Sequence, residues 1–485
     1  MTGGTLDVAT REGRQATLTP EQVDAVESRV NGPLLRAGDA GWDEAVLVWN
    51  GMVAMTPALV IQPTSADDVA AAVGFARDHG LLLSIKGGGH NIAGTSIAEG
   101  GLTLDMSRMR EIRVDPAARL AYVGPGSLLK DVDSATQEHG LATVLGFISE
   151  VGVAGLTLGG GLGYLTRRFG WTVDNLEEVE IVTADGEICT AGREKNADLF
   201  WALRGGGGNF GVVTRFTFRL HDVGPNVFGG LIAWPFERAD EILRAYRTIT
   251  AESPRELAVW MILLHAPAMP FVPEDWHGRK ICAMVVCYSG DLDEAEEALV
   301  PIRALGNPVV DVLQEWPYTQ QQSFLDDGEP KGAHYDWKTE YIAELSDGLL
   351  DAVRDVFAAC PIPEAMVGFL QLGGALNERD EDDGAVGNRD ARFACGVNGM
   401  WEPGEPDAEA YRRWIRDGWA RVRPFSTGRT YINFQTADEG DDRTAEAYGK
   451  NFARLRRIKA AWDQNNLFRV NRNIPPAPDG QSSAE

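Results

Sequence analysis

Glycine is concentrated in three short segments, and this pattern constrains the fold more than any other feature of the sequence. Residues 151–163 hold six glycines in thirteen positions. The other two segments are Lys86-Gly87-Gly88-Gly89-His90-Asn91 and the four glycines at 205–208. Such segments cannot build a side-chain core, but their backbone can lie against a large flat ligand or form a nest for phosphate oxygens. A flexible loop, or a tightly packed connection between domains, would have the same composition.

Hydrophobic spacing predicts that the first part of the chain mixes strands and helices. Strands are predicted at residues 58–61, 81–85, 102–106, 120–123, 179–183 and 212–220. Residues 66–79 are predicted to form a helix, because a Ser/Thr cap precedes them, acidic residues follow in the first turn and Gly80 comes at the end. The pattern is typical of an α+β fold.

The amino-acid composition changes near residue 224, beyond which tryptophans and tyrosines become frequent. Beyond this point we expect a strand at 281–288, amphipathic helices at 292–305 and 411–422, and an acidic surface loop at 377–388. A chain of 485 residues is too long for one ordinary core. The sequence therefore predicts at least two domains with a break near residue 224.

Charge and cysteine content exclude several classes of protein. The chain has 45 basic and 71 acidic residues, a net charge of −26, which disfavours nucleic acid and anionic membranes as partners. Its five cysteines form no Cys-x-x-Cys pair, so neither a disulfide framework nor a metal site is predicted. Because no apolar run is long enough for a signal sequence or a membrane span, a cytoplasmic location is expected.

A polar and aromatic motif near the end of the chain suggests chemistry. If Tyr431-Ile432-Asn433-Phe434 is a strand, Tyr431 and Asn433 share one face. A phenol beside a carboxamide can act as an acid–base pair. A buried tyrosine with a purely structural role would have the same sequence.

Taken in order, these motifs resemble those of FAD-linked oxidases of the vanillyl-alcohol oxidase superfamily, which have a PCMH-type FAD-binding domain, and within it the berberine-bridge-enzyme-like branch. The resemblance covers nearly the whole chain, through PALVIQP, KGGGHN, GVAGLTLGGGLG, DNLEEVEIVTADG, DLFWALRGGGGNFGVVT, YINF and NNLFRVNRNIPP. It implies a two-domain α+β fold, with an FAD-binding domain at 1–222 and 425–485 and a sheet-plus-helices substrate domain at 223–424. A nicotinamide-dependent reductase is disfavoured, since no GxGxxG motif stands between a strand and a helix.

The resemblance also implies a cofactor, FAD, joined covalently to His90. We expect a single link, because Ile148 stands where many members carry a second, cysteine link. A small residue at Val151 favours an oxidase. The other cofactor-binding residues that the resemblance and the glycine motifs indicate are Lys86, Gly87, Gly88, Gly89, Asn91, Gly94, Ser149, Val151, Gly152, Gly155, Gly159, Gly160, Gly163, Gly211, Val213, Asn433, Asn471 and Asn473.

For the reaction, the resemblance implies that Tyr431, its pKa lowered by neighbours, takes a proton from a substrate hydroxyl while hydride passes to the flavin. Dioxygen then becomes hydrogen peroxide. Gln371, Tyr318 and Trp337 are possible substrate-side residues. An FAD-dependent dehydrogenase with another acceptor, and a flavin-binding protein without turnover, remain alternatives. The aromatic content after residue 224 favours a flat substrate, and a sugar, phenolic alcohol, alkaloid or polyketide is compatible with the sequence.

Overall fold

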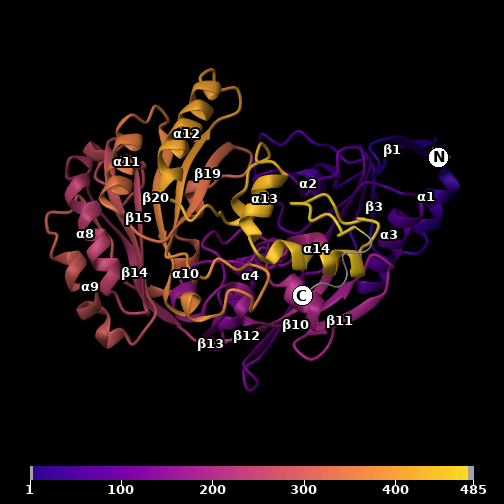
Figure 1. The fold of residues 1–485 in the computed structure, drawn as a ribbon, viewed down its shortest axis with the longest axis horizontal. Helices are drawn as coiled ribbons and strands as arrows, with labels where there is room; N and C mark the ends of the chain where they lie inside the picture. Colours follow the sequence, from indigo (N-terminus) through magenta and orange to yellow (C-terminus); the bar gives the residue numbers. More distant parts are fainter. Residues whose placement is uncertain (1–3, 479–485) are drawn as a thin grey trace.

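One lobe of the molecule is built on a single eight-stranded antiparallel sheet (Figure 1). Seven strands follow in the order β17-β14-β16-β15-β20-β21-β19, and β18 also pairs with β14. The strands are β14 (Asn226–Pro235), β15 (Leu257–His265), β16 (Lys280–Tyr288), β17 (Val310–Asp311), β18 (Gln314–Pro317), β19 (His334–Ile342), β20 (Glu364–Gln371) and β21 (Phe393–Trp401).

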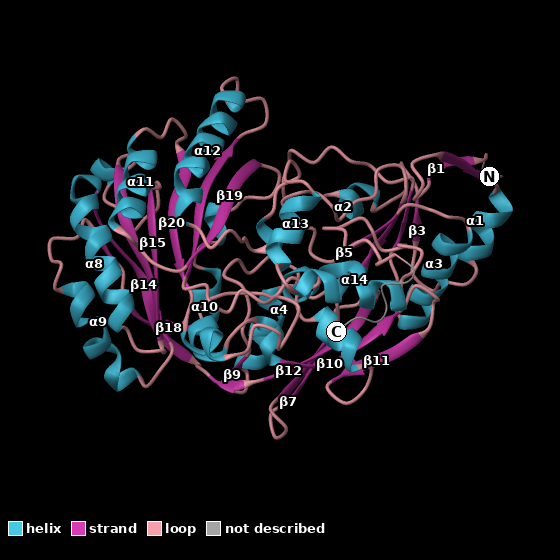
Figure 2. Ribbon diagram, in the orientation of Figure 1, coloured by secondary structure: helices cyan, strands magenta, loops and turns pink. Residues whose placement is uncertain are grey.

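Four helices cover one face of this sheet (Figure 2). They are α8 (Ala239–Glu252), α9 (Ala295–Arg303), α11 (Asp347–Ala358) and α12 (Ala408–Val422). In α11 the Ser346 side chain caps the first turn, and Leu349, Val353 and Val356 form a stripe that packs into the core beneath. The opposite face of the sheet, which we call the inner face, is turned toward the rest of the chain.

The other lobe contains smaller sheets. In a four-stranded sheet β4 (Leu59–Ile61) and β5 (Leu83–Lys86) run parallel to β6 (Leu102–Asp105), with β3 (Leu34–Leu35) antiparallel at its edge. The five-stranded sheet comprises β7 (Ile112–Asp115), β8 (Leu120–Val123), β10 (Leu176–Val182), β11 (Ile188–Gly192) and β12 (Val212–Arg219). Two further pairs are β1 (Leu6–Ala9) with β2 (Gln15–Leu18), and β9 (Leu141–Ala142) with β13 (His221–Asp222).

The end of the chain returns to this second lobe (Figure 1). Lys459 lies in the last helix and is fully buried, and its ammonium group donates to Asp463 and to the carbonyl of Asn209. The remaining helices are α1 (Pro20–Glu27), α2 (Trp42–Val46), α3 (Ala66–Asp78), α4 (Leu129–Gln137), α5 (Val153–Leu158), α6 (Thr166–Phe169), α7 (Ala197–Leu203), α10 (Tyr318–Ser323), α13 (Asp441–Tyr448) and α14 (Asn451–Trp462).

The computed structural model describes residues 4–478, and its α+β fold confirms the predicted class. Within that range no helix is long and apolar enough to cross a bilayer. The same residues contain no cluster of histidine, cysteine and acidic side chains that could hold a metal ion. The predicted domain limits, near residues 222 and 425, remain a prediction.

Two local predictions need correction. The predicted surface loop at 377–388 is exposed or half-buried only as far as residue 383, because residues 384–388 are buried and Val386 fills the space that Gly160 and Gly205 leave open. The bidentate ion pair between Arg389 and Asp174 holds the end of this segment inside the molecule. Residues 431–434 are not a strand but a single 3-10 turn, Ile432–Phe434.

Candidate active site

A cavity of about 1000 Å³ lies between the glycine-rich segments and the inner face of the large sheet. Its lining includes residues 87–91, 151–152 and 207–209 from the second lobe, together with residues of β15, β19, β20 and β21. A volume of this size is at the upper end for small-molecule sites. The cavity is therefore large enough for a dinucleotide-sized ligand or for a cofactor and a substrate together.

Two glycine segments meet through bare backbone in the cavity wall. A Cβ atom added to Gly88 would lie 2.5 Å from the backbone nitrogen of Gly152, and one added to Gly152 would lie 2.2 Å from that of Gly88. Unbonded heavy atoms pack at about 3.5–4.0 Å, so neither position admits a side chain. The two segments thus form one continuous backbone surface, which explains why glycine is required at both.

His90 lies beside this surface in a stack of aromatic rings. Its imidazole stacks on Trp49 at 4.3 Å between ring centroids, and Trp49 stacks on Tyr335 at 3.8 Å. The Trp49 indole N–H donates to the carbonyl of Glu329 at 3.1 Å, which fixes the middle ring. Burial lowers the pKa of His90 to about 4, so the imidazole is neutral near pH 7 and keeps a free nitrogen lone pair.

Tyr431 is buried, and its hydroxyl oxygen contacts the glycine-rich segment 151–163. This oxygen accepts hydrogen bonds from the Gly161 N–H and from the Asn433 side-chain amide, each at 2.9 Å. The Asn433 amide also donates to the carbonyls of Gly155 and Leu156 in α5. Burial raises the pKa of Tyr431 above the ordinary phenol value, although both hydrogen bonds oppose this change. The expectation of a lowered pKa is therefore wrong, because the loss of water outweighs the two donors.

Strand β19 holds the segment that carries Tyr431. Trp337 and Thr339, whose side chains lie on the inner face of the sheet, make the first set of contacts. The Trp337 indole N–H donates to the Phe434 carbonyl at 2.7 Å. The hydroxyls of Thr339 and Thr430 are 2.8 Å apart, and Thr430 also donates to the Thr339 carbonyl. These contacts attach residues 430–434 to the edge of the large sheet.

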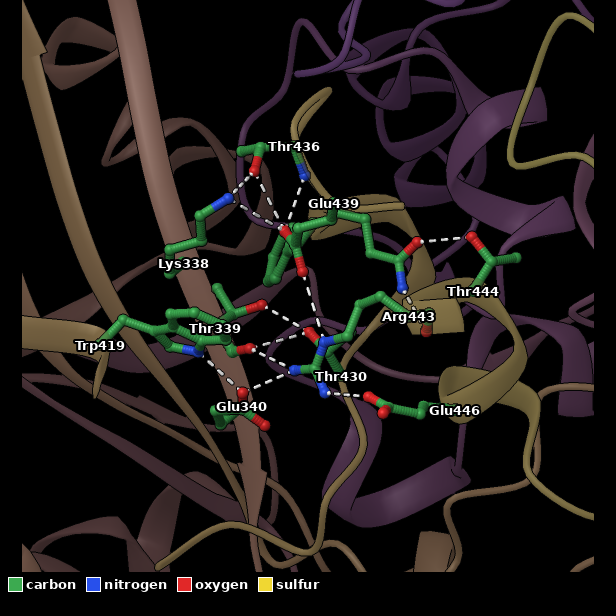
Figure 3. A network of polar contacts seen from close by, with 12 residues as sticks. Lys338, Thr339, Glu340, Trp419, Thr430, Thr436, Glu439, Arg443, Thr444 and Glu446 are labelled. Atoms are coloured by element: carbon green, nitrogen blue, oxygen red, sulfur yellow. Dashed lines mark hydrogen bonds and ion pairs between the residues drawn. The ribbon is translucent and has the colours of Figure 1, made fainter. Parts of the chain in front are cut away.

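The alternate side chains of β19 contact the residues that follow this segment, 436–443, and helix α12 (Figure 3). The Lys338 ammonium group donates to Asp438 at 2.5 Å and also to Thr436. The Arg443 guanidinium donates to Glu340 at 2.6 Å, and the Trp419 indole N–H donates to the same carboxylate oxygen. We call this set of polar contacts the β19 clamp; its Glu340–Arg443 pair is buried on both sides, whereas Asp438 is exposed.

Many of the predicted site residues do come together at the cavity. Those that line it are Gly87, Gly88, Gly89, His90, Asn91, Val151, Gly152, Gly155, Gly211, Val213, Trp337, Tyr431, Asn433 and Asn471. They come from positions up to 384 residues apart (471 − 87), and the fold gathers them around one space. Whether each contacts a cofactor stays a prediction.

Other predicted cofactor residues lie behind the cavity wall. The Lys86 ammonium group donates to the Ala45 carbonyl at 2.8 Å, and the Ser149 hydroxyl donates to Asp326 at 2.5 Å. Five further residues are absent from the lining. They are Gly94, Gly159, Gly160, Gly163 and Asn473, of which the four glycines lie where a Cβ atom would clash with neighbouring atoms.

Two of the three predicted substrate-side residues do not line the cavity. The Gln371 side chain points to the helix-covered face of β20, where it accepts from the Val259 N–H and donates to the Thr250 carbonyl. Tyr318 is fully buried in α10, within an apolar cluster. Only Trp337 lines the cavity. For Gln371 the error arises because successive residues of a strand face opposite sides, and the sequence does not show which side is the inner one. Tyr318 begins a helix, α10, and the sequence does not show that its side chain is buried there.

Three residues that line or support the cavity, Trp49, Glu329 and Asn398, are not among those predicted from the sequence. Burial raises the pKa of Glu329 to about 8, so this carboxyl group is largely protonated near pH 7. The alternating pattern of β21 contained the information for Asn398, since it is a polar residue within a buried strand. Nothing in the local sequence distinguishes Trp49 or Glu329 from ordinary loop residues.

Comparison with known proteins places the chain in a family. The model described as "FAD binding domain" matches residues 57–192, and the model described as "Berberine and berberine like" matches residues 430–475. An FAD-linked oxidoreductase of Dictyostelium discoideum is 30% identical over 453 residues, which cover 92% of this chain and 95% of that protein. The chain belongs to the berberine-bridge-enzyme-like FAD-linked oxidoreductases.

Other members of this family are similar along their whole length. The (R)-6-hydroxynicotine oxidase of Paenarthrobacter nicotinovorans is 29% identical, with 92% of this chain and 97% of that protein covered. The crystal structure of 6-hydroxy-D-nicotine oxidase from Arthrobacter nicotinovorans has a TM-score of 0.83 and 26% identity, over 92% of this chain and 98% of that one. A xylooligosaccharide oxidase of Thermothelomyces thermophilus is 26% identical, with 94% of each chain covered.

The cavity fits the cofactor of this berberine-bridge-enzyme-like family. Its wall at Gly88 and Gly152 is backbone alone, which gives a flat ring system close access to N–H and carbonyl groups. The side-chain oxygen of Asn471, at the cavity lining, is buried without a hydrogen-bond partner among the described residues. A hydroxyl group of the cofactor's ribityl chain can supply the missing donor.

Proposed function

We propose that this protein is an oxidase that removes a hydride from the CH–OH group of a small molecule, with FAD joined to the chain by one covalent bond at His90, and that it reduces dioxygen to hydrogen peroxide. The observation that carries the proposal is that a neutral imidazole and a buried phenol line one cavity together with bare glycine backbone. Similarity to a hydroxynicotine oxidase and to a xylooligosaccharide oxidase supports oxidase chemistry.

Bound FAD supplies the hydride acceptor. Tyr431 holds the substrate hydroxyl, and its phenolate form, produced when its own proton passes to solvent, accepts the hydroxyl proton as the C–H bond breaks. The Gly161 N–H and the Asn433 amide, which already donate to the Tyr431 oxygen, stabilise the negative charge that develops on the phenol oxygen when it loses its own proton. The aromatic contact with Trp49 keeps the His90 imidazole against the cavity.

We propose only one covalent bond between the chain and FAD, because the residue at the position of the second link has no thiol. Ile148, which stands where related enzymes carry a cysteine, is buried and lines the cavity. The five cysteines are free thiols at positions 189, 282, 287, 360 and 395. None of them lies within the glycine-rich segments.

We expect the intact mass of the denatured protein to exceed the chain mass by one FAD. His90→Ala should remove this increase, because no other neutral imidazole is offered by the glycine-rich wall. His139→Ala, which changes an exposed histidine outside the cavity, should keep it. A native protein with the bare chain mass would contradict the covalent bond at His90.

We also expect dioxygen to be the electron acceptor. Holoenzyme reduced anaerobically with one equivalent of dithionite should regain its oxidised flavin spectrum on mixing with air, and should release one equivalent of hydrogen peroxide. This measurement needs no knowledge of the substrate. Slow reoxidation by air with fast reoxidation by a quinone or dye would instead favour a dehydrogenase.

A further inference from the structure

Residues 49–51 join the loop that carries His90 to the start of β19, and we call them the bridge. On the side of the loop, the Trp49 N–H donates to the Gly89 carbonyl at 2.9 Å, and the indole stacks on the imidazole with an interplanar angle of 16°. On the side of the sheet, the Gly332 N–H donates to the Trp49 carbonyl at 2.8 Å. Trp49 is therefore in contact with both walls of the cavity.

Asn50 is the polar centre of the bridge. Its amide donates to the carbonyls of Ile92 and Tyr335, each at 3.1 Å, so one side chain contacts both the segment after His90 and the first residues of β19. Its oxygen accepts from the Tyr335 N–H at 3.2 Å and from the Met52 N–H at 3.1 Å. Because Asn50 is only 3% exposed, water cannot replace these four hydrogen bonds.

The bridge sets the position of His90 from outside the cavity. None of its three residues lines the cavity, whereas His90 and Tyr335, which it joins, both do. Within residues 4–478 the imidazole makes no hydrogen bond to another residue, so its stack on Trp49 sets the plane of the ring. Trp49 is in turn stacked on Tyr335. The position of the imidazole thus depends on a strand of the large sheet.

Bare backbone joins the bridge to the sheet at Gly51. The Gly51 N–H donates to the Ala333 carbonyl at 2.8 Å, and a Cβ atom added to Gly51 would lie 2.0 Å from the Gly332 carbonyl oxygen. Two unbonded heavy atoms cannot approach so closely, and a backbone carbonyl cannot turn aside as a flexible side chain can. A methyl group at this position must therefore push the bridge and the sheet apart.

We propose that Trp49 and Asn50 are positioning residues for the covalent attachment of FAD to His90, and that they make this attachment depend on β19 lying in place beside the loop of His90. The inference rests on the covalent bond of the proposed function. Formation of that bond replaces a C–H bond of a methyl group on the flavin ring and the imidazole N–H by one C–N bond. The two protons and two electrons that are released reduce dioxygen, the proposed acceptor, to hydrogen peroxide.

The imidazole nitrogen has to meet the methyl carbon along the direction of its lone pair. A misplacement of about 1 Å can slow a reaction roughly 10²-fold, so a ring held in one plane is preorganised for this attack. Without Trp49 the imidazole can turn about its side-chain bonds. Without the contacts of Asn50 and Gly51, the loop and the sheet can move relative to one another.

The test measures covalent and non-covalent FAD separately in the full-length protein. Synthesis in bacterial cells is stopped after a short induction, and protein is purified from samples taken at intervals. Intact mass gives the fraction of chains bonded to FAD, and the flavin released by acid gives the remainder. In Trp49→Leu we expect the bonded fraction to rise at least tenfold more slowly than in wild type, with total FAD per chain unchanged. Trp49→Phe keeps a ring for the stack and should restore most of the rate.

A control and a second variant separate positioning from stability. Trp414→Leu removes another tryptophan whose indole N–H donates to a backbone carbonyl, outside the cavity, and should leave the rate unchanged. Gly51→Ala should slow bond formation although His90 and Trp49 are intact, and it covers the case in which Trp49→Leu fails to fold. Bond formation at the wild-type rate in Trp49→Leu or in Gly51→Ala would overturn the proposal.

The remaining outcomes distinguish the bridge from the bond itself. Loss of total FAD together with the bond in both variants would show that the bridge only stabilises the fold, and would also overturn the proposal. A wild-type protein with the bare chain mass rejects the covalent bond at His90, and with it the proposed function in that respect. A bonded wild type with unaffected variants rejects the role of the bridge alone.

Discussion

Tyr431→Phe should lower kcat by about 10²–10⁴-fold, the usual contribution of a positioned acid–base group. The change removes one oxygen atom that receives two hydrogen bonds, and leaves the ring in contact with Phe434 and Trp171. The fold and the covalent flavin should therefore persist. The measurement is the rate of flavin reduction by a substrate alcohol, with intact mass as the check on the cofactor.

The role of Tyr431 also predicts the direction in which kcat changes with pH. Because burial raises the pKa of Tyr431, the phenol is protonated near pH 7, and its ionised fraction grows about tenfold per pH unit below that pKa. If Tyr431 takes the substrate proton, kcat rises with pH through the neutral and alkaline range. Tyr431→Phe should lose this slope, whereas Tyr122→Phe, outside the cavity, should keep it. Equal slopes in wild type and Tyr431→Phe would rule out the proton transfer.

Arg443→Met should lower the free energy of unfolding by about 3–5 kcal/mol, the usual effect of removing one partner of a buried ion pair. Glu340 is 1% exposed and Arg443 is 7% exposed, so water cannot replace the lost guanidinium. The Glu340 carboxylate would keep only the Trp419 indole as a donor. Urea denaturation followed by tryptophan fluorescence measures the change.

Two further variants separate this effect from a general loss of charge. The double variant Glu340→Leu with Arg443→Met should recover most of the lost stability, because it removes the unpaired carboxylate as well. Arg416→Met breaks an exposed ion pair with Glu409 in the same lobe and should cost at most about 1 kcal/mol. An equal loss in Arg416→Met and Arg443→Met would show that burial of the β19 clamp is irrelevant to its strength.

The sequence predicted well those features that depend on local chemistry. Residues 120–123 form β8 at the predicted positions, and α3 begins after Ser65, whose hydroxyl accepts from the Asp68 N–H. The glycine motifs around His90 and Gly152 correctly indicated a bare backbone surface, which lies in the cavity wall. In each case the physical cause, a cap, an alternation or a missing side chain, lies within a few residues.

The errors concern features that depend on distant parts of the chain. Gly155 lines the cavity whereas Gly160 lies under Val386, yet both are glycines in one motif. Residues 377–388 are acidic, but Val386 is buried in spaces made by glycines that lie far earlier in the chain. The pKa of Tyr431 depends on how deeply the residue is buried, which its neighbours in sequence do not show.

The contact between Tyr431 and Gly161 joins residues that are 270 positions apart. During synthesis the glycine-rich segments, and then all strands of the large sheet, are therefore translated before Tyr431. The β19 clamp also forms late, because the partners of Lys338 and Glu340 are translated long after β19 itself. A nascent chain that has reached residue 425 contains the glycine-rich segments and the large sheet but lacks Tyr431, the acid–base group proposed above, and the cavity-lining residues Phe468, Val470, Asn471 and Arg472. Assembly of a competent site is thus a late event in the life of the chain, and productive use of the cofactor has to wait for it.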